Sequence, residues 1–233
     1  MGDTDIVGWL DDYFWGAMVV LRVFGVSLIL AVIFGLMGSA AKLSRSRIAQ
    51  GLASAYTVVF RGTPELLVLL ILYFGAAVTL TAIAQSIDPT IKFIDIPPFW
   101  AGATGIALIV GAYMTETFRG AFLGVDYGQI EAARALGISN FQTFFYVRVP
   151  QMWRLALPNF GNHMLSLMKD TALISVIGLE EIVFVAEIAT TVTVKPFTMY
   201  FIVALIYLAI TTVITLGVSG LEKYSNRHLV GSR

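Results

Sequence analysis

Apolar residues along this chain come in long blocks rather than in short alternating runs. Blocks with few charged positions cover about residues 13–41, 52–85, 99–122, 155–179 and 197–221. Each block matches or exceeds the roughly 20 residues with which an α-helix crosses the hydrocarbon core of a bilayer. The pattern therefore predicts an all-α integral membrane protein, with residues 1–233 forming a single domain of five membrane-spanning helices.

The second block contains a predicted break at Arg61-Gly-Thr-Pro64. A less apolar helical stretch, Ile48 to Phe60, precedes the break, and the strongly apolar stretch Pro64 to Gln85 follows it. Proline lacks a backbone donor and glycine relaxes the chain, so these residues favour a kink. We count both stretches as one crossing, because counting two would move the segment from Asp126 to Arg154 to the other side of the membrane.

The charged residues between the blocks predict the orientation. Basic residues follow the first span, separate the third from the fourth and follow the fifth: Lys42, Arg45, Arg47, Arg134, Arg148, Arg154, Lys223, Arg227 and Arg233. Acidic residues dominate the remaining segments, with only Lys92 and Lys195 against them: Asp3, Asp5, Asp11, Asp12, Asp88, Asp95, Glu180, Glu181 and Glu187. By the positive-inside rule, the amino terminus lies outside and the carboxyl terminus lies in the cytoplasm.

Composition removes several classes of function. The chain has 58% hydrophobic and 13% charged residues, and its 15 Lys and Arg balance its 15 Asp and Glu. No overall basic field is available to hold nucleic acid. Because the chain has no cysteine and only His163 and His228, thiolate and histidine metal sites are excluded as well.

The predicted cytoplasmic segment 126–150 has the pattern of two short helices joined by a tight turn. Capping residues mark both starts: Asp126 with Gln129, and Ser139 with Gln142. Gly137 supplies a left-handed stop after the first helix, and Pro150 is expected to close the second, Asn140 to Val147. The second helix carries an aromatic face with a basic end: Phe141, Phe144, Phe145 and Arg148. On periodicity alone, we prefer an ordinary loop helix over a knob that docks into another protein.

The order of residues in this segment resembles the EAA loop of permease subunits from bacterial binding-protein-dependent ABC importers. Glu131-Ala-Ala133 is followed after three intervening residues by Gly137 and, after nine further intervening residues, by Val147-Arg-Val-Pro150. Valines replace the usual Ile and Leu, and Asp126 replaces the usual Pro before the loop helix.

Further stretches resemble the polar amino acid branch of that family: Ala41-Lys-Leu-Ser44, Arg61-Gly-Thr-Pro-Glu65, Gly111-Ala-Tyr-Met-Thr-Glu-Thr-Phe-Arg-Gly-Ala121, Leu157-Pro-Asn-Phe-Gly-Asn162 and Lys169-Asp-Thr-Ala-Leu173. They extend the similarity from about Gly16 to Tyr224. The run Tyr113 to Gly120 is most similar to the subunits that serve uptake of histidine, lysine, arginine and ornithine, or of opines.

The resemblance implies a role and a set of partners. The EAA loop docks into a cytoplasmic ATP-binding cassette ATPase dimer, and its coupling residues would be Glu131, Ala132, Ala133, Gly137, Phe141, Arg148 and Pro150. A second permease subunit, homologous but not identical, and a periplasmic solute-binding protein complete the expected complex in the bacterial inner membrane. No Lys follows a Gly, so a G-x-x-x-x-G-K-[ST] phosphate loop is absent. We expect a transport subunit, not an enzyme, that binds no cofactor itself and relies on a partner using ATP and Mg²⁺.

Ionisable side chains inside membrane spans are costly and therefore need a partner, a water-filled cavity or a function. Candidate substrate-contacting residues surround two predicted helix breaks: Arg61, Thr63, Glu65, Glu116, Lys169, Asp170 and Thr171. Their acidic members favour a cationic amino acid. The alternative is that Arg61 with Glu65, and Glu116 with Arg119, pair at helical spacing without any ligand. We interpret His163 as a packed, hydrogen-bonded residue.

Two other classes of function are weaker interpretations. An ion-gradient-driven secondary carrier could use Lys169, Asp170 and Glu116 as a relay, but the chain has no inverted repeat and has a conspicuous cytoplasmic loop. A membrane-embedded enzyme lacks a Ser, His and acid arrangement in register.

Overall fold

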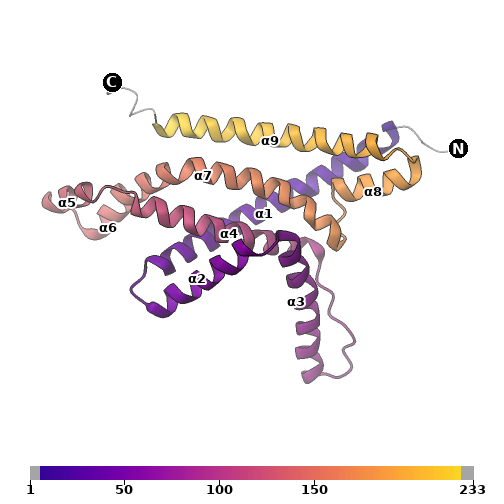
Figure 1. Ribbon diagram of the computed structural model, residues 1–233, viewed down its shortest axis with the longest axis horizontal. Coiled ribbons are helices and arrows are strands. Elements are labelled where there is room, and N and C mark those ends of the chain that lie inside the picture. Colours follow the sequence, from indigo (N-terminus) through magenta and orange to yellow (C-terminus); the bar gives the residue numbers. More distant parts are fainter. Residues whose placement is uncertain (1–5, 227–233) are drawn as a thin grey trace.

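The computed structural model describes residues 6–226, and every regular element within them is a helix (Figure 1). In chain order these are the 3₁₀ helix η1 (Ile6–Trp9), α1 (Leu10–Leu43), α2 (Arg47–Gly62), α3 (Glu65–Ile87), α4 (Pro98–Leu123), α5 (Tyr127–Ala135), α6 (Asn140–Thr143), the π-helical turn η2 (Phe144–Arg148), α7 (Val149–Asp170), the 3₁₀ helix η3 (Thr171–Ile177), α8 (Ile182–Thr193) and α9 (Pro196–Asn226). The predicted all-α class is confirmed. Asp3, Asp5, Arg227, His228 and Arg233 lie outside the described residues.

Helix α4 occupies the centre of the molecule, between α1 and α7. Small residues allow α1 and α4 to approach closely. A Cβ atom on Gly38 would lie 2.3 Å from Oγ1 of Thr115, and one on Gly35 would lie 2.7 Å from Cβ of Met114. Such contacts between small residues are typical of helix packing in membranes, where apolar side chains alone give little driving force for association. The α1–α4 contact therefore holds the core of the fold.

Within residues 6–226, four helices are long and apolar enough to cross a membrane: Val7–Leu43, Glu65–Ile87, Pro98–Leu123 and Pro196–Ser225. Helix α7 has 22 residues but is not among them. One of its faces carries Asn159, Asn162 and His163, which lowers its hydropathy. The fold is thus of the membrane type, while the fifth span and the orientation stay predictions.

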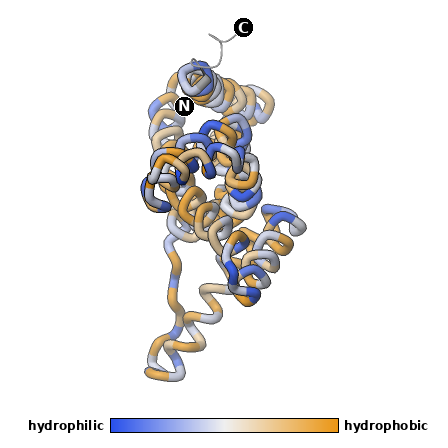
Figure 2. Tube along the Cα trace, turned by 90° about the vertical axis from the view of Figure 1, so that its left-hand side faces the viewer, coloured by the Kyte–Doolittle hydropathy of each residue, from blue (hydrophilic) through white to orange (hydrophobic). Residues whose placement is uncertain are grey.

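The predicted break in the second block is confirmed and separates two distinct helices. Helix α2 ends at Gly62, Thr63 is extended at φ −107° and ψ 141°, and α3 begins at Glu65. Helix α2 packs back against α1 and α4, whereas α3 turns away from the bundle (Figure 1). Figure 2 shows α3 and the segment after it projecting from the bundle. Residues 52–85 are therefore not one helix, and α3 alone supplies the apolar length.

The prediction that Pro150 closes the second loop helix is wrong. The chain stays helical from Asn140 to Asp170, passing through the wide turn η2. In that turn the Val149 N–H donates to the Phe144 carbonyl, five residues back. A π-helical turn is wider than an α-helical one, so it accommodates the ring and the missing N–H of Pro150 at the second position of α7.

The two predicted caps of the segment 126–150 have different outcomes. The Ser139–Gln142 capping box forms as predicted. At the first helix, the Asp126 side chain caps α5 by accepting from the Gly128 N–H at 2.8 Å. The Gln129 side chain, however, accepts from Gln151 Nε2 at 2.5 Å rather than returning to the cap. A contact between α5 and α7 thus replaces the predicted hydrogen bond from the Gln129 side chain to the cap residue Asp126.

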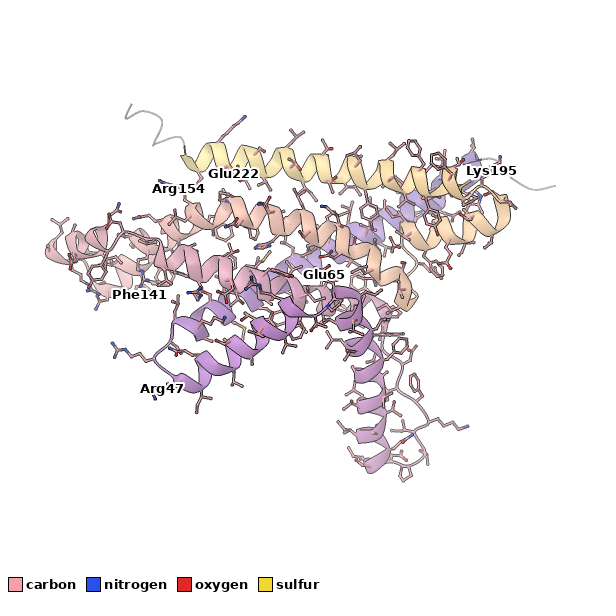
Figure 3. The ribbon with its side chains drawn as sticks, viewed as in Figure 1. Arg47, Glu65, Phe141, Arg154, Lys195 and Glu222 are labelled. Carbon is pink, nitrogen blue, oxygen red and sulfur yellow. The ribbon has the colours of Figure 1, made fainter. Side chains whose placement is uncertain are left out.

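The segments with predicted basic clusters lie at one end of the molecule. The turn between α1 and α2, helices α5 and α6, and the carboxyl-terminal end of α9 are all there, while the start of α1 and helix α8 lie at the opposite end (Figure 1). Arg47, Arg154 and Phe141 mark the first end and Lys195 the second (Figure 3).

Candidate functional site

A cavity of about 450 Å³ lies where the start of α3 meets α4 and α7. It is lined by Val110 together with residues that carry polar groups: Glu65, Tyr113, Asn159, Asn162, His163, Ser166 and Asp170. The α7 members are spaced three or four residues apart, so they share one face of that helix. The polar face of α7 thus lines a cavity rather than facing lipid.

Two breaks in helical structure place the acidic residues of this cavity. Glu65 is the first residue of α3, directly after the break at Thr63 and Pro64. Asp170 is the last residue of α7, before the backbone tightens into η3. The two carboxyl groups lie within hydrogen-bonding reach of each other. Glu65 stands near the centre of the molecule in Figure 3. Breaks of this kind are how membrane proteins bring polar groups to the depth of a cavity.

Polar and aromatic contacts shape the α4 side of the cavity. The Arg61 guanidinium lies over the Tyr113 ring, 5.3 Å from its centroid, as a cation–π contact. The His163 ring nitrogen Nε2 is 2.8 Å from the Thr117 hydroxyl. His163 is therefore hydrogen-bonded as predicted, but it also lines the cavity. A sequence signal could have identified His163 as a cavity residue. It is the spacing of polar residues along one face of α7: Asn159, Asn162, His163, Ser166 and Asp170.

Of the predicted substrate-contacting residues, only Glu65 and Asp170 line this cavity. The break between Arg61 and Glu65 removes the helical spacing on which their predicted pairing depends, and Arg61 contacts Tyr113 instead. Lys169 is exposed, whereas Thr171 is buried and does not line the cavity.

Glu116 belongs to a second polar group, among α1, α2 and α4. Its carboxylate forms an ion pair with Lys42 and accepts from Arg119 Nε at 2.9 Å. The Lys42 ammonium also donates to the Thr57 hydroxyl at 2.7 Å. The predicted Glu116–Arg119 pair is thus present and is joined by a lysine from another helix. These charges line an open hollow of about 400 Å³ with Gln50 and Ser54.

The segment 126–150 presents an exposed surface at its end of the molecule. Glu131 and Ala132 are exposed and Ala133 is buried. Gly137 has φ +76°, the left-handed conformation predicted for it, and it turns the chain from α5 toward α6. Pro150 is exposed on the first turn of α7.

Aromatic side chains brace this segment against α4. The Phe144 ring stacks on Phe122 of α4 at 6.0 Å between centroids, and the Arg148 guanidinium lies 5.8 Å from the centroid of the same Phe122 ring. Phe141 packs on Phe145 at 4.7 Å yet remains 72% exposed. The aromatic face is thus split, with Phe144 turned inward and Phe141 left free.

Within the described residues, no group of three or more His, Cys, Asp or Glu side chains is arranged to hold a metal ion.

Comparison with known proteins identifies the family. Residues 27–224 match the family described as binding-protein-dependent transport system inner membrane component. The chain belongs to this family. Its members are transport components rather than enzymes, and they work with an ATPase and a binding protein.

Similar sequences cover nearly the whole chain. The chain is 42% identical over 198 residues to the histidine/lysine/arginine/ornithine transport system permease protein HisQ of Salmonella typhimurium, covering 85% of this chain and 86% of that protein. It is 40% identical over 220 residues to the nopaline transport system permease protein NocQ of Agrobacterium fabrum, covering 94% and 93%. It is 36% identical over 214 residues to the arginine ABC transporter permease protein ArtQ of Haemophilus influenzae, covering 92% and 93%.

Solved structures have the same fold. A crystal structure of an amino acid ABC transporter with histidines includes a chain that is 31% identical, with a TM-score of 0.81, covering 96% of this chain and 99% of that one. The MetNI methionine ABC transporter in an inward-facing conformation has a TM-score of 0.72 at 16% identity, over 97% and 99% of the two chains. At that identity the second likeness concerns the fold alone.

Proposed function

We propose that this chain is the permease subunit of an ABC importer that moves a basic amino acid or an opine from the periplasm to the cytoplasm. Its relatives include permeases named for histidine, lysine, arginine, ornithine and nopaline transport. The observation that carries the choice of substrate class is the cavity with Glu65 and Asp170 at one end.

The chemistry of the cavity fits such a substrate. Its volume of about 450 Å³ is in the range of small-molecule sites. Two facing carboxylates can hold a guanidinium or ammonium group by charge-assisted hydrogen bonds. The Asn159, Asn162 and Ser166 side chains supply neutral donors for a substrate carboxylate, and the Arg61 guanidinium lies over the ring of Tyr113, which lines the cavity. We assign no substrate contact to Lys169, which is exposed, or to Glu116, which lies in the separate group with Lys42 and Arg119.

The orientation we propose has five spans, with α7 as the fourth in chain order, the amino terminus outside and the carboxyl terminus in the cytoplasm. The gathering of the α1–α2 turn, α5, α6 and the end of α9 at one end of the molecule supports it. A membrane-spanning helix with a polar face needs a cavity or a protein neighbour on that face. Helix α7 meets that condition because its polar residues line the cavity.

Coupling to ATP hydrolysis is assigned to the segment 126–150. We propose that Glu131, Ala132, Gly137 and Phe141 contact a cytoplasmic ATPase, which hydrolyses ATP with Mg²⁺. Their exposure leaves them available to a partner. The exposed apolar side chains of α3 support a second, homologous permease subunit in the bacterial inner membrane, with a periplasmic binding protein delivering the substrate.

The proposal is tested by reconstituting the whole complex, with its ATPase and binding protein, in liposomes. We expect uptake of labelled L-arginine to require ATP and the binding protein, and to fall at least tenfold in Glu65→Gln and Asp170→Asn. Glu187→Gln, on the exposed surface of α8, is the matched control and should leave uptake unchanged. Uptake that follows an ion gradient without ATP, or that survives both cavity substitutions, would contradict the proposal.

A further inference from the structure

The end of α7 is held by a hydroxyl that lies outside the cavity. At Thr171 the backbone changes from the α-helix α7 to the 3₁₀ helix η3. A 3₁₀ helix has fewer residues per turn than an α-helix, so side chains leave the two kinds of helix in different directions. The position of the change from α7 to η3 therefore affects the direction of the neighbouring Asp170 side chain. The Thr171 side chain is 1% exposed and donates to the Met168 carbonyl at 2.7 Å.

Tyr207 of α9 reaches this junction from a distant part of the chain. Its hydroxyl oxygen lies 3.2 Å from Oγ1 of Thr171. The two hydroxyls lie within hydrogen-bonding distance, and either one can be the donor in this contact. The bond ties the first residue of η3 to α9.

The same hydroxyl also faces Glu181, at the other end of the connecting segment. Glu181 is 1% exposed and caps α8, with its Oε1 accepting from the Val183 and Phe184 N–H groups at 2.9 and 3.2 Å. Its Oε2 atom is buried and has no hydrogen-bond partner among the described residues. One tyrosine thus lies against both ends of residues 171–181.

The segment between these ends has little freedom. Gly178 ends η3 in the left-handed conformation, with φ +88°. Ile174 fills the space over Gly102 of α4, where an added Cβ atom would lie 2.5 Å from its Cγ2 atom. A movement at Tyr207 would therefore be transmitted to Asp170 rather than absorbed by a loose loop.

We propose that Tyr207 is a positioning residue of the cavity, whose hydroxyl fixes the end of α7 through Thr171 and so keeps the Asp170 carboxyl directed toward Glu65. The inference rests on the proposed function, because it assigns a role in substrate binding to a residue outside the cavity. The Tyr207 ring belongs to the apolar packing of α8 and α9, so Tyr207→Phe keeps that packing and removes only the hydroxyl.

The experiment measures equilibrium binding of labelled L-arginine to the purified permease–ATPase complex without its binding protein. We expect Tyr207→Phe to raise Kd about five- to tenfold, the effect of losing one or two hydrogen bonds. Complex yield, thermal unfolding midpoint and basal ATP hydrolysis should stay close to those of the native complex. Tyr200→Phe, an exposed tyrosine of the same helix, is the matched control and should bind as the native complex does.

Substitutions at Thr171 give an independent readout. Thr171→Ser keeps the hydroxyl and should keep the native Kd, whereas Thr171→Val should raise it as Tyr207→Phe does. The double variant Tyr207→Phe/Thr171→Val should weaken binding by less than the two single effects combined, since both substitutions remove the bond between Tyr207 and Thr171. An unchanged Kd in Tyr207→Phe, or a lowered unfolding midpoint without a change in Kd, would overturn the positioning role.

The outcomes separate this inference from the proposed function. If Asp170→Asn weakens binding and Tyr207→Phe does not, only the positioning role fails. If the native complex does not bind L-arginine, or if Asp170→Asn and Glu65→Gln bind as tightly as the native complex, the proposed cavity fails and the inference fails with it.

Discussion

Lys42 at the end of α1 forms an ion pair with Glu116 of α4, across a span of 74 residues in the sequence. Only 14% of the Lys42 side chain and 23% of the Glu116 side chain are exposed. Arg119 and Thr57 complete the group, so the pair joins α1, α2 and α4 next to the close α1–α4 contact. From this position we propose a structural role for Glu116 rather than contact with substrate.

Glu116→Gln should therefore destabilise the protein without weakening substrate binding. The substitution leaves the partly buried Lys42 ammonium without its countercharge, at a cost of about 2 kcal/mol. Thermal unfolding of the purified complex in detergent would report the loss. Combining Glu116→Gln with Lys42→Met should recover part of it. An unchanged unfolding midpoint, or a raised Kd for L-arginine, would contradict this role.

Gly38→Ala should destabilise the α1–α4 contact. The new methyl group would lie 2.3 Å from Oγ1 of Thr115, whose β-branched side chain has little freedom to move away. Overpacking of this kind costs about 1–3 kcal/mol. Gly51→Ala on α2 is the matched control, since a Cβ atom there has no neighbour within 4 Å and a helical Gly→Ala change is favourable. Thr115→Ala should rescue Gly38→Ala in the same unfolding measurement, and a failure of this rescue would count against the steric explanation.

Phe141→Ala should weaken the association with the ATPase while leaving the permease itself folded. The Phe141 side chain is 72% exposed and packs mainly on Phe145 of the same segment. Truncating an aromatic residue that anchors an interface typically costs about 1 kcal/mol or more of binding free energy. The measurement is the fraction of ATPase that copurifies with the permease. Phe93→Ala, an equally apolar and exposed change in the segment after α3, should have no effect. Full recovery of the ATPase with Phe141→Ala would remove Phe141 from the coupling surface.

Stability should fall as pH rises through neutrality because of Glu181. Burial raises the pKa of Glu181 from its usual 4.5 to about 7, against the opposing effect of the Val183 and Phe184 N–H groups and the Tyr207 hydroxyl. The folded state therefore binds this proton more tightly than the unfolded state. The contribution is fully present below about pH 4.5 and is lost as pH rises through about 7, with an upper bound of about 3 kcal/mol.

Glu181→Gln cannot ionise and should flatten this dependence. Unfolding midpoints of the purified complex, compared between pH 5 and pH 8, provide the measurement. The native complex should lose more stability over this interval than the variant. An equal loss in both would assign the dependence to other groups.

Local features of this protein were predictable because they depend on residues close together in the chain. The break at Arg61 to Pro64, the left-handed Gly137 and the Ser139 cap each follow from backbone preferences over a few positions. The prediction that Pro150 ends a helix was wrong because it did not take the preceding turn into account. A π-helical turn before the proline accommodates it, and no pattern of apolar positions signals such a turn.

The order of residues was enough to predict the helical class, the apolar lengths, the two breaks that place Glu65 and Asp170, and the resemblance of the segment 126–150 to a coupling loop. Which polar side chains meet depends on how the helices pack. Lys42 pairs with Glu116 and Tyr207 meets Thr171 because helices distant in sequence pack with particular rotations about their axes. Those rotations depend on close contacts such as Gly38 on Thr115, which are properties of the packed bundle rather than of any one segment.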